Sequence, residues 1–341
     1  MTGTGMELAG FSRRGKSESL RGLTGSRHEA GRVSDQPRCS AHLACPVCGS
    51  ALADTGSSAG CAEGHSFDYA RSGYLNLTRS GGGRPRAGDT AAMIEARAEF
   101  LGAGHYEPIA GAVAGAAIAG ASAPPATDPI PAPAAAGNAA SALMLLAEIG
   151  SGTGYYLDAA ARALRERGLG PACAFGVDIS KAAAVHAARR HGELRFVVAD
   201  VEAAIPLRDS AADVVLSVFS PRPGGELGRV VRPGGELVVA FAGERHLARL
   251  RERLGLIGVH EGKPERLAER LEPWFDPVAT EAVEYELKLG GEDARRLALM
   301  GPNAWHGFDP AALDGGHSDL VSVIVTRFRR SAKASRSPAS G

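Results

Sequence analysis

Three cysteines and one histidine form two close pairs near the start of the chain, Cys45 with Cys48 and Cys61 with His65. Thiolates two residues apart sit on a knuckle whose backbone turns both sulfurs toward one ion, and the second pair can complete a tetrahedron. Four soft or borderline donors leave no position for water, so the pattern predicts a closed structural zinc site. The alternative is a group of buried cysteines without a ligand.

Two of the five cysteines fall outside this spacing. Cys39 is interpreted as a bystander, and Cys173 lies in a predicted strand and is expected in the core. Clustered cysteines in a chain of this size do not resemble a secreted disulfide framework, and in a reducing compartment they more often bind metal.

A second informative stretch is an apolar run that ends in alternating glycines, as at a buried parallel strand that turns into a helix beneath a nucleotide. Glycine allows a positive φ and close approach of a ligand to the backbone. A dinucleotide fingerprint would need glycine at Tyr155, whereas the acidic-x-Gly-x-Gly-x-Gly form is associated with S-adenosylmethionine. The alternative is a surface loop in a chain with 45 glycines. The residues expected at the ligand are Glu148, Gly150, Gly152, Thr153 and Gly154.

Two further acids end predicted strands. Asp178 follows the apolar run 172–177, where a carboxylate can accept hydrogen bonds from both ribose hydroxyls of a nucleoside. Its alternative role is the N-cap of the following helix. Asp200 follows the run 194–199 and is expected near the adenine.

Strands and helices alternate after the glycine turn, which predicts an α/β fold. Further strands are expected at 213–221 and near 235–239, and a final edge strand at Val321–Phe328. The succession predicts a class I, Rossmann-like S-adenosylmethionine methyltransferase domain preceded by a small zinc-ribbon-like domain.

A basic, aromatic segment follows the cysteine cluster. Arginines can neutralise phosphates and aromatic rings can stack on splayed bases, so this segment is a candidate RNA-binding surface. Composition alone is equally consistent with a polar loop. The candidate residues are Arg71, Tyr74, Arg79, Arg84 and Arg86.

The composition of the whole chain sets broader bounds. A chain of 341 residues has room for one large domain or two ordinary ones. The formal net charge of zero argues against a protein that coats nucleic acid. The sequence has no apolar run long enough to span a bilayer, and Met1–Gly10 does not resemble a secretory signal, so a cytoplasmic protein is expected.

Composition also divides the chain into domains. We expect a disordered extension at 1–44, a zinc-binding RNA-recognition domain at 45–87, a connecting helical segment at 88–120, an Ala/Pro-rich linker at 121–142, the methyltransferase domain at 143–330 and a disordered tail at 331–341.

The order of several short motifs resembles the zinc-containing 23S rRNA guanine-N1 methyltransferases, the RlmA family. The motifs are Cys-Pro-x-Cys, Cys-x3-His-x-Phe-Asp, Gly-Tyr-Leu-Asn-Leu, Gly-Asp-Thr, Met93–Arg97 and Phe100–Pro108. The resemblance extends from about Cys45 to Arg329.

This resemblance implies that the zinc domain binds RNA and that the enzyme methylates N1 of a guanine in a hairpin of domain II of 23S rRNA. Some members of the family protect ribosomes against macrolide-type antibiotics. By the same resemblance, Tyr106 and His246 lie against the cofactor and Trp305 is a stacking residue for RNA; without it, His246 would be an exposed histidine and Trp305 a core residue.

Two other functions remain open from the sequence. One is a small-molecule methyltransferase that carries a zinc ribbon, and the other is a non-catalytic RNA-binding module that retains the methyltransferase fold. No side chain is assigned as the general base for guanine N1, and the choice between monomer and homodimer is open.

Overall fold

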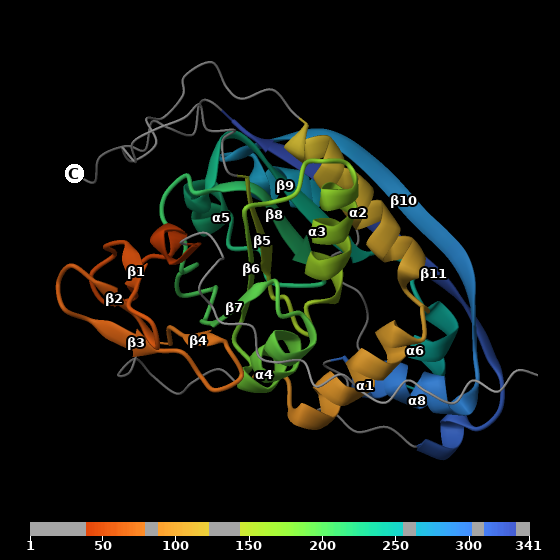
Figure 1. Cartoon of the computed structure of the whole chain (residues 1–341). Coiled ribbons are helices and arrows are strands. Elements are labelled where there is room, and N and C mark those ends of the chain that lie inside the picture. The colour runs from red at the N-terminus through yellow and green to blue at the C-terminus, as the bar shows by residue number, and fades with distance from the viewer. Residues whose placement is uncertain (1–38, 79–87, 123–143, 255–263, 302–309, 332–341) are drawn as a thin grey trace, which may run out of the picture. The chain divides into compact units, whose positions relative to one another are not determined.

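The computed structural model describes residues 39–78, 88–122, 144–254, 264–301 and 310–331. An eight-stranded sheet in the order β10-β11-β9-β8-β5-β6-β7-β4 forms its centre (Figure 1). Within this sheet β4 to β9 pair in parallel, while β10 and β11 are antiparallel to their neighbours. The fold is therefore a Rossmann-like α/β domain with a mixed sheet, as the sequence predicts.

The strands of the central sheet are β4 (Leu75–Asn76), β5 (Leu145–Ile149), β6 (Cys173–Asp178), β7 (Arg195–Val198), β8 (Ala212–Val218), β9 (Val231–Ala242), β10 (Phe275–Leu289) and β11 (His317–Arg330). The helices are α1 (Ala91–Gly102), α2 (Glu107–Ala121), α3 (Tyr155–Glu166), α4 (Lys181–Arg190), α5 (Gly224–Val230), α6 (Ala248–Leu254), α7 (Pro264–Leu271) and α8 (Gly291–Leu299). None of the described helices is both long and apolar enough to cross a bilayer.

The core lies on both faces of the sheet because successive side chains of a strand point to opposite sides. In β5, all five residues are buried, and Leu146 belongs to a cluster with α2 and α3 while Leu145 belongs to a cluster with α5 and α7. Helices α2 and α3 lie side by side over one face (Figure 1). A strand covered on both faces needs a continuous apolar run, which β5 has apart from Glu148.

The cysteine-rich segment forms a separate three-stranded antiparallel sheet of β1 (Leu52–Asp54), β2 (Ser58–Cys61) and β3 (Ser66–Asp68). The chain then enters the central sheet, where β4 pairs in parallel with β7 through Leu75 and Val197. Leu75 and Leu77 are buried in the same apolar cluster as Leu145. The sequence analysis did not anticipate that this module contributes a strand to the central sheet.

The predicted disorder through Ala44 is wrong for residues 39–44. Cys39–His42 form a 3-10 helix, η2, and Leu43 is buried and bridges to Leu207. This segment is ordered because its apolar residues pack against the central domain. The rest of the expected extension, residues 1–38, lies outside the described residues.

A disulfide joins Cys39 to Cys173 across 134 residues of sequence. The interpretation of Cys39 as a bystander is therefore wrong, and the buried Cys173 in β6 has a covalent partner as well as a place in the core. Spacing could not reveal this pair because the two cysteines come together only when β6 has formed.

The expected edge strand at Val321–Phe328 is not at the edge. It is part of β11, which lies between β9 and β10, and β10 is the edge strand. Most side chains of β10 are exposed, and this polar character hid it from a search for buried runs.

The connecting segment forms two helices. Thr90 caps α1 by accepting a hydrogen bond from the Met93 amide at 3.3 Å. Helix α2 begins at Glu107 and ends at Ala121, the first residue of the expected linker. Residues 123–142 of that linker and 332–341 of the expected tail lie outside the described residues.

Candidate functional site

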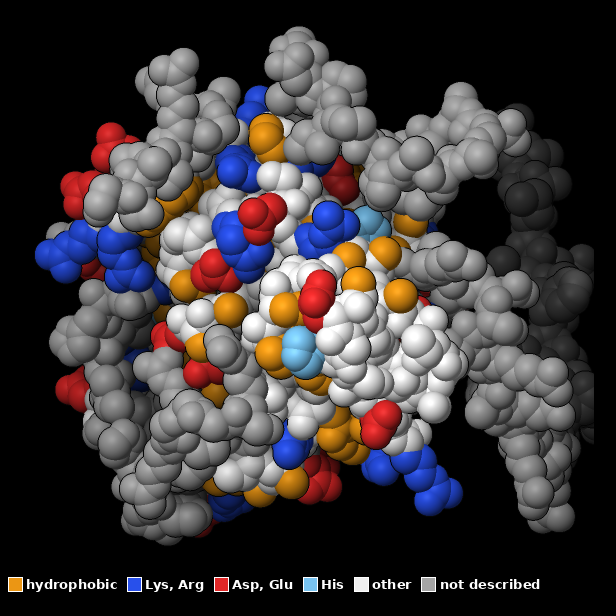
Figure 2. All heavy atoms as spheres, turned by 90° about the vertical axis from the view of Figure 1, so that its left-hand side faces the viewer, with side chains coloured by type: hydrophobic (Ala, Val, Ile, Leu, Met, Phe, Trp, Pro, Cys, Tyr) orange, Lys and Arg blue, Asp and Glu red, His pale blue; other side chains and the backbone are white. Residues whose placement is uncertain are grey.

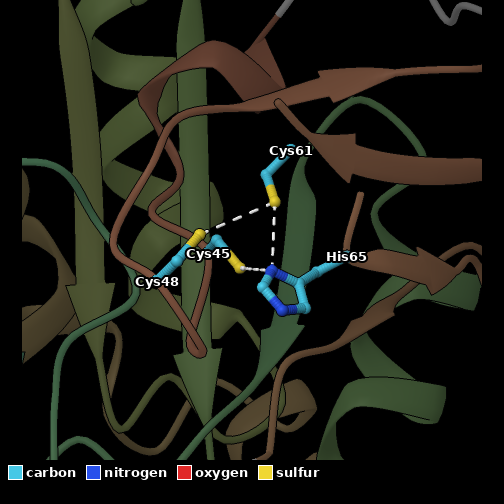
Figure 3. A group of neighbouring side chains, drawn as sticks. All are labelled: Cys45, Cys48, Cys61 and His65. Carbon is cyan, nitrogen blue, oxygen red and sulfur yellow. Dashed lines mark hydrogen bonds between the residues drawn. The ribbon is translucent and has the colours of Figure 1, made fainter. Parts of the chain in front are cut away.

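The four predicted metal ligands come together from three places in the ribbon (Figure 3). Cys48 Sγ lies 3.6 Å from Cys61 Sγ, and His65 Nδ1 lies 3.3 Å from Cys61 Sγ and 3.7 Å from Cys45 Sγ. A tetrahedral zinc ion with bonds of about 2.3 Å to sulfur and about 2.0 Å to nitrogen separates its ligand atoms by roughly 3.5–3.8 Å. The donor set and spacing therefore fit a closed zinc site.

The surroundings of the cluster favour deprotonated sulfur at its exposed side. Hydrogen bonds from the Ser50 side chain and backbone lower the pKa of Cys48 to about 6. Cys45 is buried, and burial raises the pKa of its thiol. A bound cation would compensate that burial, since thiolate is the form that binds metal.

The glycine turn has the backbone geometry that its sequence predicts. Gly150, Gly152 and Gly154 have φ values of +71°, +51° and +79°. The amides of Gly150 and Ser151 both donate to the Val177 carbonyl, at 2.7 and 3.1 Å, which fixes the turn against β6. The turn lies at the carboxyl end of β5, the edge where ligands bind in open α/β sheets.

Asp178 lies beside this turn at the end of β6. One carboxylate oxygen accepts the Gly152 amide and the other accepts the Ser180 amide, both at 2.8 Å. Helix α4 is instead capped by Ser180, which accepts from Ala183, so the alternative role of Asp178 as that N-cap is wrong. Each carboxylate oxygen keeps further lone-pair capacity for ligand hydroxyls.

The other two predicted acids act differently. Glu148 is buried, accepts the Leu157 amide at 2.9 Å, and has a pKa raised well above its usual range by burial. It therefore fixes the start of α3 beneath the turn. Asp200, after β7, is half-buried and accepts the Glu202 amide at 3.0 Å.

Tyr106 and His246 come together at the same edge of the sheet. Tyr106 Oη lies 3.4 Å from His246 Nε2, and His246 Nδ1 accepts the Ser322 amide at 3.2 Å. Burial lowers the pKa of His246 to about 4. The histidine is therefore neutral at physiological pH, with its proton assigned to Nε2 because Nδ1 accepts a backbone hydrogen bond.

Phe219 is a functional candidate that the sequence analysis named only as part of a segment near the target site. It follows β8 with a φ of +50°, and its ring lies between 6.2 and 6.4 Å from the rings of Tyr106, Tyr156 and His246. The side chain is still 43% exposed. A non-glycine residue at positive φ that exposes a large ring is unusual and marks a functional site more often than a packing position.

The predicted RNA-binding residues are only partly described. Arg71 is exposed, and Tyr74 is half-buried against the central core. Arg79, Arg84, Arg86 and Trp305 lie outside the described residues. On the face shown in Figure 2, the described Lys and Arg side chains lie among Asp and Glu and do not gather in one patch.

Comparison with known proteins identifies both modules. Residues 43–78 match the zinc-ribbon family model described as "RlmA, N-terminal", and residues 146–235 match a model described as "Methyltransferase domain".

Three named relatives are similar over most of their length. A "23S rRNA (guanine(748)-N(1))-methyltransferase" of Streptomyces fradiae is 39% identical, over 84% of this chain and 96% of the relative. A "Putative 23S rRNA (guanine-N(1)-)-methyltransferase" of Micromonospora griseorubida is 40% identical, over 86% and 96%. A Bacillus subtilis protein with the same description is 31% identical, over 62% and 67%.

Proposed function

The chain belongs to the 23S rRNA (guanine-N1)-methyltransferases, and from this membership we propose that it methylates N1 of a guanine in a domain II hairpin of 23S rRNA. The observation that supports this proposal most directly is the presence in one chain of the Cys3His cluster and the glycine turn that holds Asp178. A ribbon suited to RNA and a nucleoside site at a sheet edge together supply the two parts that such a reaction needs.

S-Adenosylmethionine, when bound, supplies a methyl group on a sulfonium centre. We assign its binding to the carboxyl edge of the sheet, where the glycines allow close backbone approach and Asp178 offers lone pairs to ribose hydroxyls. Glu148 acts from below by fixing α3. The full set assigned to the cofactor is Tyr106, Glu148, Gly150, Gly152, Thr153, Gly154, Asp178, Asp200 and His246.

The zinc ion is assigned to Cys45, Cys48, Cys61 and His65, and its role is structural because four protein donors complete the coordination. The RNA-binding surface is assigned to Arg71, Tyr74, Arg79, Arg84, Arg86 and Trp305. Of these residues, Arg71 is exposed and Tyr74 lies immediately before β4, so the described part of this surface adjoins the central sheet.

The chain's own contribution to methyl transfer is to hold the guanine in line with the methyl group. The exposed ring of Phe219 lies at the carboxyl end of β8, next to β5 in the sheet. We assign it as the face on which the flipped guanine stacks, because aromatic side chains commonly hold extruded bases in this way.

Phe219→Ala is expected to lower kcat/KM for RNA methylation by roughly 5- to 100-fold, the range for loss of one stacking contact. Phe219→Trp keeps a stacking face and should retain most activity. Val278→Ala is a matched control, because Val278 is 42% exposed and lies in β10, away from this edge. Equal kcat/KM for Phe219→Ala and the control would remove the stacking assignment.

The proposed reaction is tested by primer extension on 23S rRNA from cells with and without the gene. N1-Methylguanine blocks the Watson–Crick edge, so reverse transcriptase should stop only when the gene is present. We expect the stop at guanine 748, the position in the name of the Streptomyces fradiae relative. Tritiated methyl from S-adenosylmethionine that appears in a low-molecular-weight product, with no stop in the rRNA, would instead identify a small-molecule methyltransferase.

Three finer features belong to the same proposal. The enzyme works in the cytoplasm, where its rRNA substrate is found, and its expression raises resistance to macrolide-type antibiotics. Two copies form a homodimer through the exposed edge of β10, whose outer backbone groups are available for pairing in the described part of the chain. Sedimentation velocity distinguishes that dimer from a monomer.

A further inference from the structure

Arg97, in α1, lies directly over the middle glycine of the turn. A Cβ atom added to Gly152 would lie 2.9 Å from Arg97 Nη1. Glycine at this position serves close approach to the backbone, and Arg97 is the side chain that makes that approach in the structure. The sequence analysis quoted this arginine within a motif but gave it no role.

Two contacts hold the guanidinium of Arg97 in place. Nη1 lies 2.6 Å from an Asp89 carboxylate oxygen, and Nη2 donates to the Met300 carbonyl at 2.5 Å. The arginine side chain is 24% exposed. These contacts use two of its five N–H groups, so donors remain for a ligand at the turn.

The segment that carries Asp89 is itself fixed to the cofactor edge. Ser180 Oγ donates to the Asp89 carbonyl at 2.6 Å, and a Cβ on Gly88 would lie 2.8 Å from Ser180 Cα. Arg97 is also close enough to Asp178 to oppose the rise in the pKa of that carboxyl that burial causes. Arg97 and Asp178 therefore belong to one site, approached from α1 and β6.

We propose that Arg97 binds the α-carboxylate of the amino-acid end of S-adenosylmethionine, an inference that rests on the proposed cofactor. The planar guanidinium fork matches a carboxylate, and its fixed position needs little ordering when the ligand arrives. Asp89 and Asp178 flank the arginine, so the three groups together carry one negative charge. This charge suits a ligand with a carboxylate, an ammonium and a sulfonium.

An RNA phosphate is the rival anion for the same arginine. The position favours the cofactor, because the guanidinium lies over the turn that reads a nucleoside and is three-quarters buried. Phosphate contacts usually come from exposed side chains that track the nucleic-acid backbone.

The test is calorimetric binding of two ligands that differ only in the carboxylate, S-adenosylmethionine and its decarboxylated form, to the full-length protein and to Arg97→Gln. Arg97→Gln should weaken binding of S-adenosylmethionine by roughly 10- to 100-fold, as expected when a hydrogen-bonded charge pair is lost. Its affinity for the decarboxylated ligand should stay near that of the unaltered protein. Arg97→Lys keeps the charge without the fork and should lie between the two.

Arg162→Gln is the matched control, because Arg162 also pairs with an aspartate but is 64% exposed on α3. Equal weakening of both ligands by Arg97→Gln and Arg97→Lys would mean that Arg97 only supports the fold and would overturn the proposal. Unchanged binding of both ligands with weaker RNA binding would assign the arginine to phosphate. A protein that binds neither ligand before substitution would instead refute the proposed cofactor.

Discussion

Gly152→Val is expected to abolish S-adenosylmethionine binding while the chain still folds. Position 152 has a φ of +51°, where a β-branched residue is strained by about 1–3 kcal/mol. Its side chain would also enter the space between the turn and Arg97, because even a Cβ atom would lie 2.9 Å from Nη1. Calorimetry should detect no binding at ligand concentrations that saturate the unaltered protein.

Gly168→Val separates the effect of space from that of strain. Gly168 also has a positive φ, +71°, but a Cβ there would meet nothing within 4 Å. This control should lose comparable stability in thermal unfolding and still bind the cofactor. If Gly152→Val bound S-adenosylmethionine with unaltered affinity, the assignment of the glycine turn would be wrong.

The second large effect is expected from Cys45→Ser combined with Cys48→Ser. Two of the four donors are lost, and zinc binding in small zinc-finger peptides contributes about 10–16 kcal/mol of folding free energy. The ribbon sheet β1–β3 should therefore lose its order, and methylation of 23S rRNA should fall below detection. Metal analysis should change from one zinc per chain to none.

Cofactor binding should be largely retained in this double variant, because the glycine turn and Asp178 are held by backbone contacts within the central domain. Cys39→Ser combined with Cys173→Ser is the matched control, since it also removes two sulfurs but leaves the Cys3His cluster intact. Full zinc content in the Cys45 and Cys48 variant would show that these residues are not ligands.

The parts of this protein that could be predicted from sequence depend on local spacing. Cys45 and Cys48 are two residues apart on one knuckle, so the sequence alone indicates that their sulfurs converge. Gly150, Gly152 and Gly154 likewise indicate positive φ within one turn. The parallel strands β5 to β9 followed from apolar runs that only a doubly covered sheet can bury.

The parts that were missed depend on contacts between distant residues. Arg97 reaches Gly152 and Met300 only after α1 and α8 pack together, and no local pattern records that approach. The exposure of Phe219 is likewise a property of the surrounding rings. β10 is different, because its alternation from Glu281 to Leu289 is visible in the sequence and a search for half-buried strands would have found it.

The pairing of β4 with β7 bears on how these enzymes can diverge. The strand that follows the ribbon is hydrogen-bonded into the sheet that carries the methyl-transfer site, and Leu77 continues the pairing through its amide bond to the Val198 carbonyl at 2.9 Å. A ribbon exchanged between relatives must therefore bring a strand that matches its new neighbour. Changes of RNA target should accordingly arise by point substitution on the ribbon surface more readily than by recombination of whole modules.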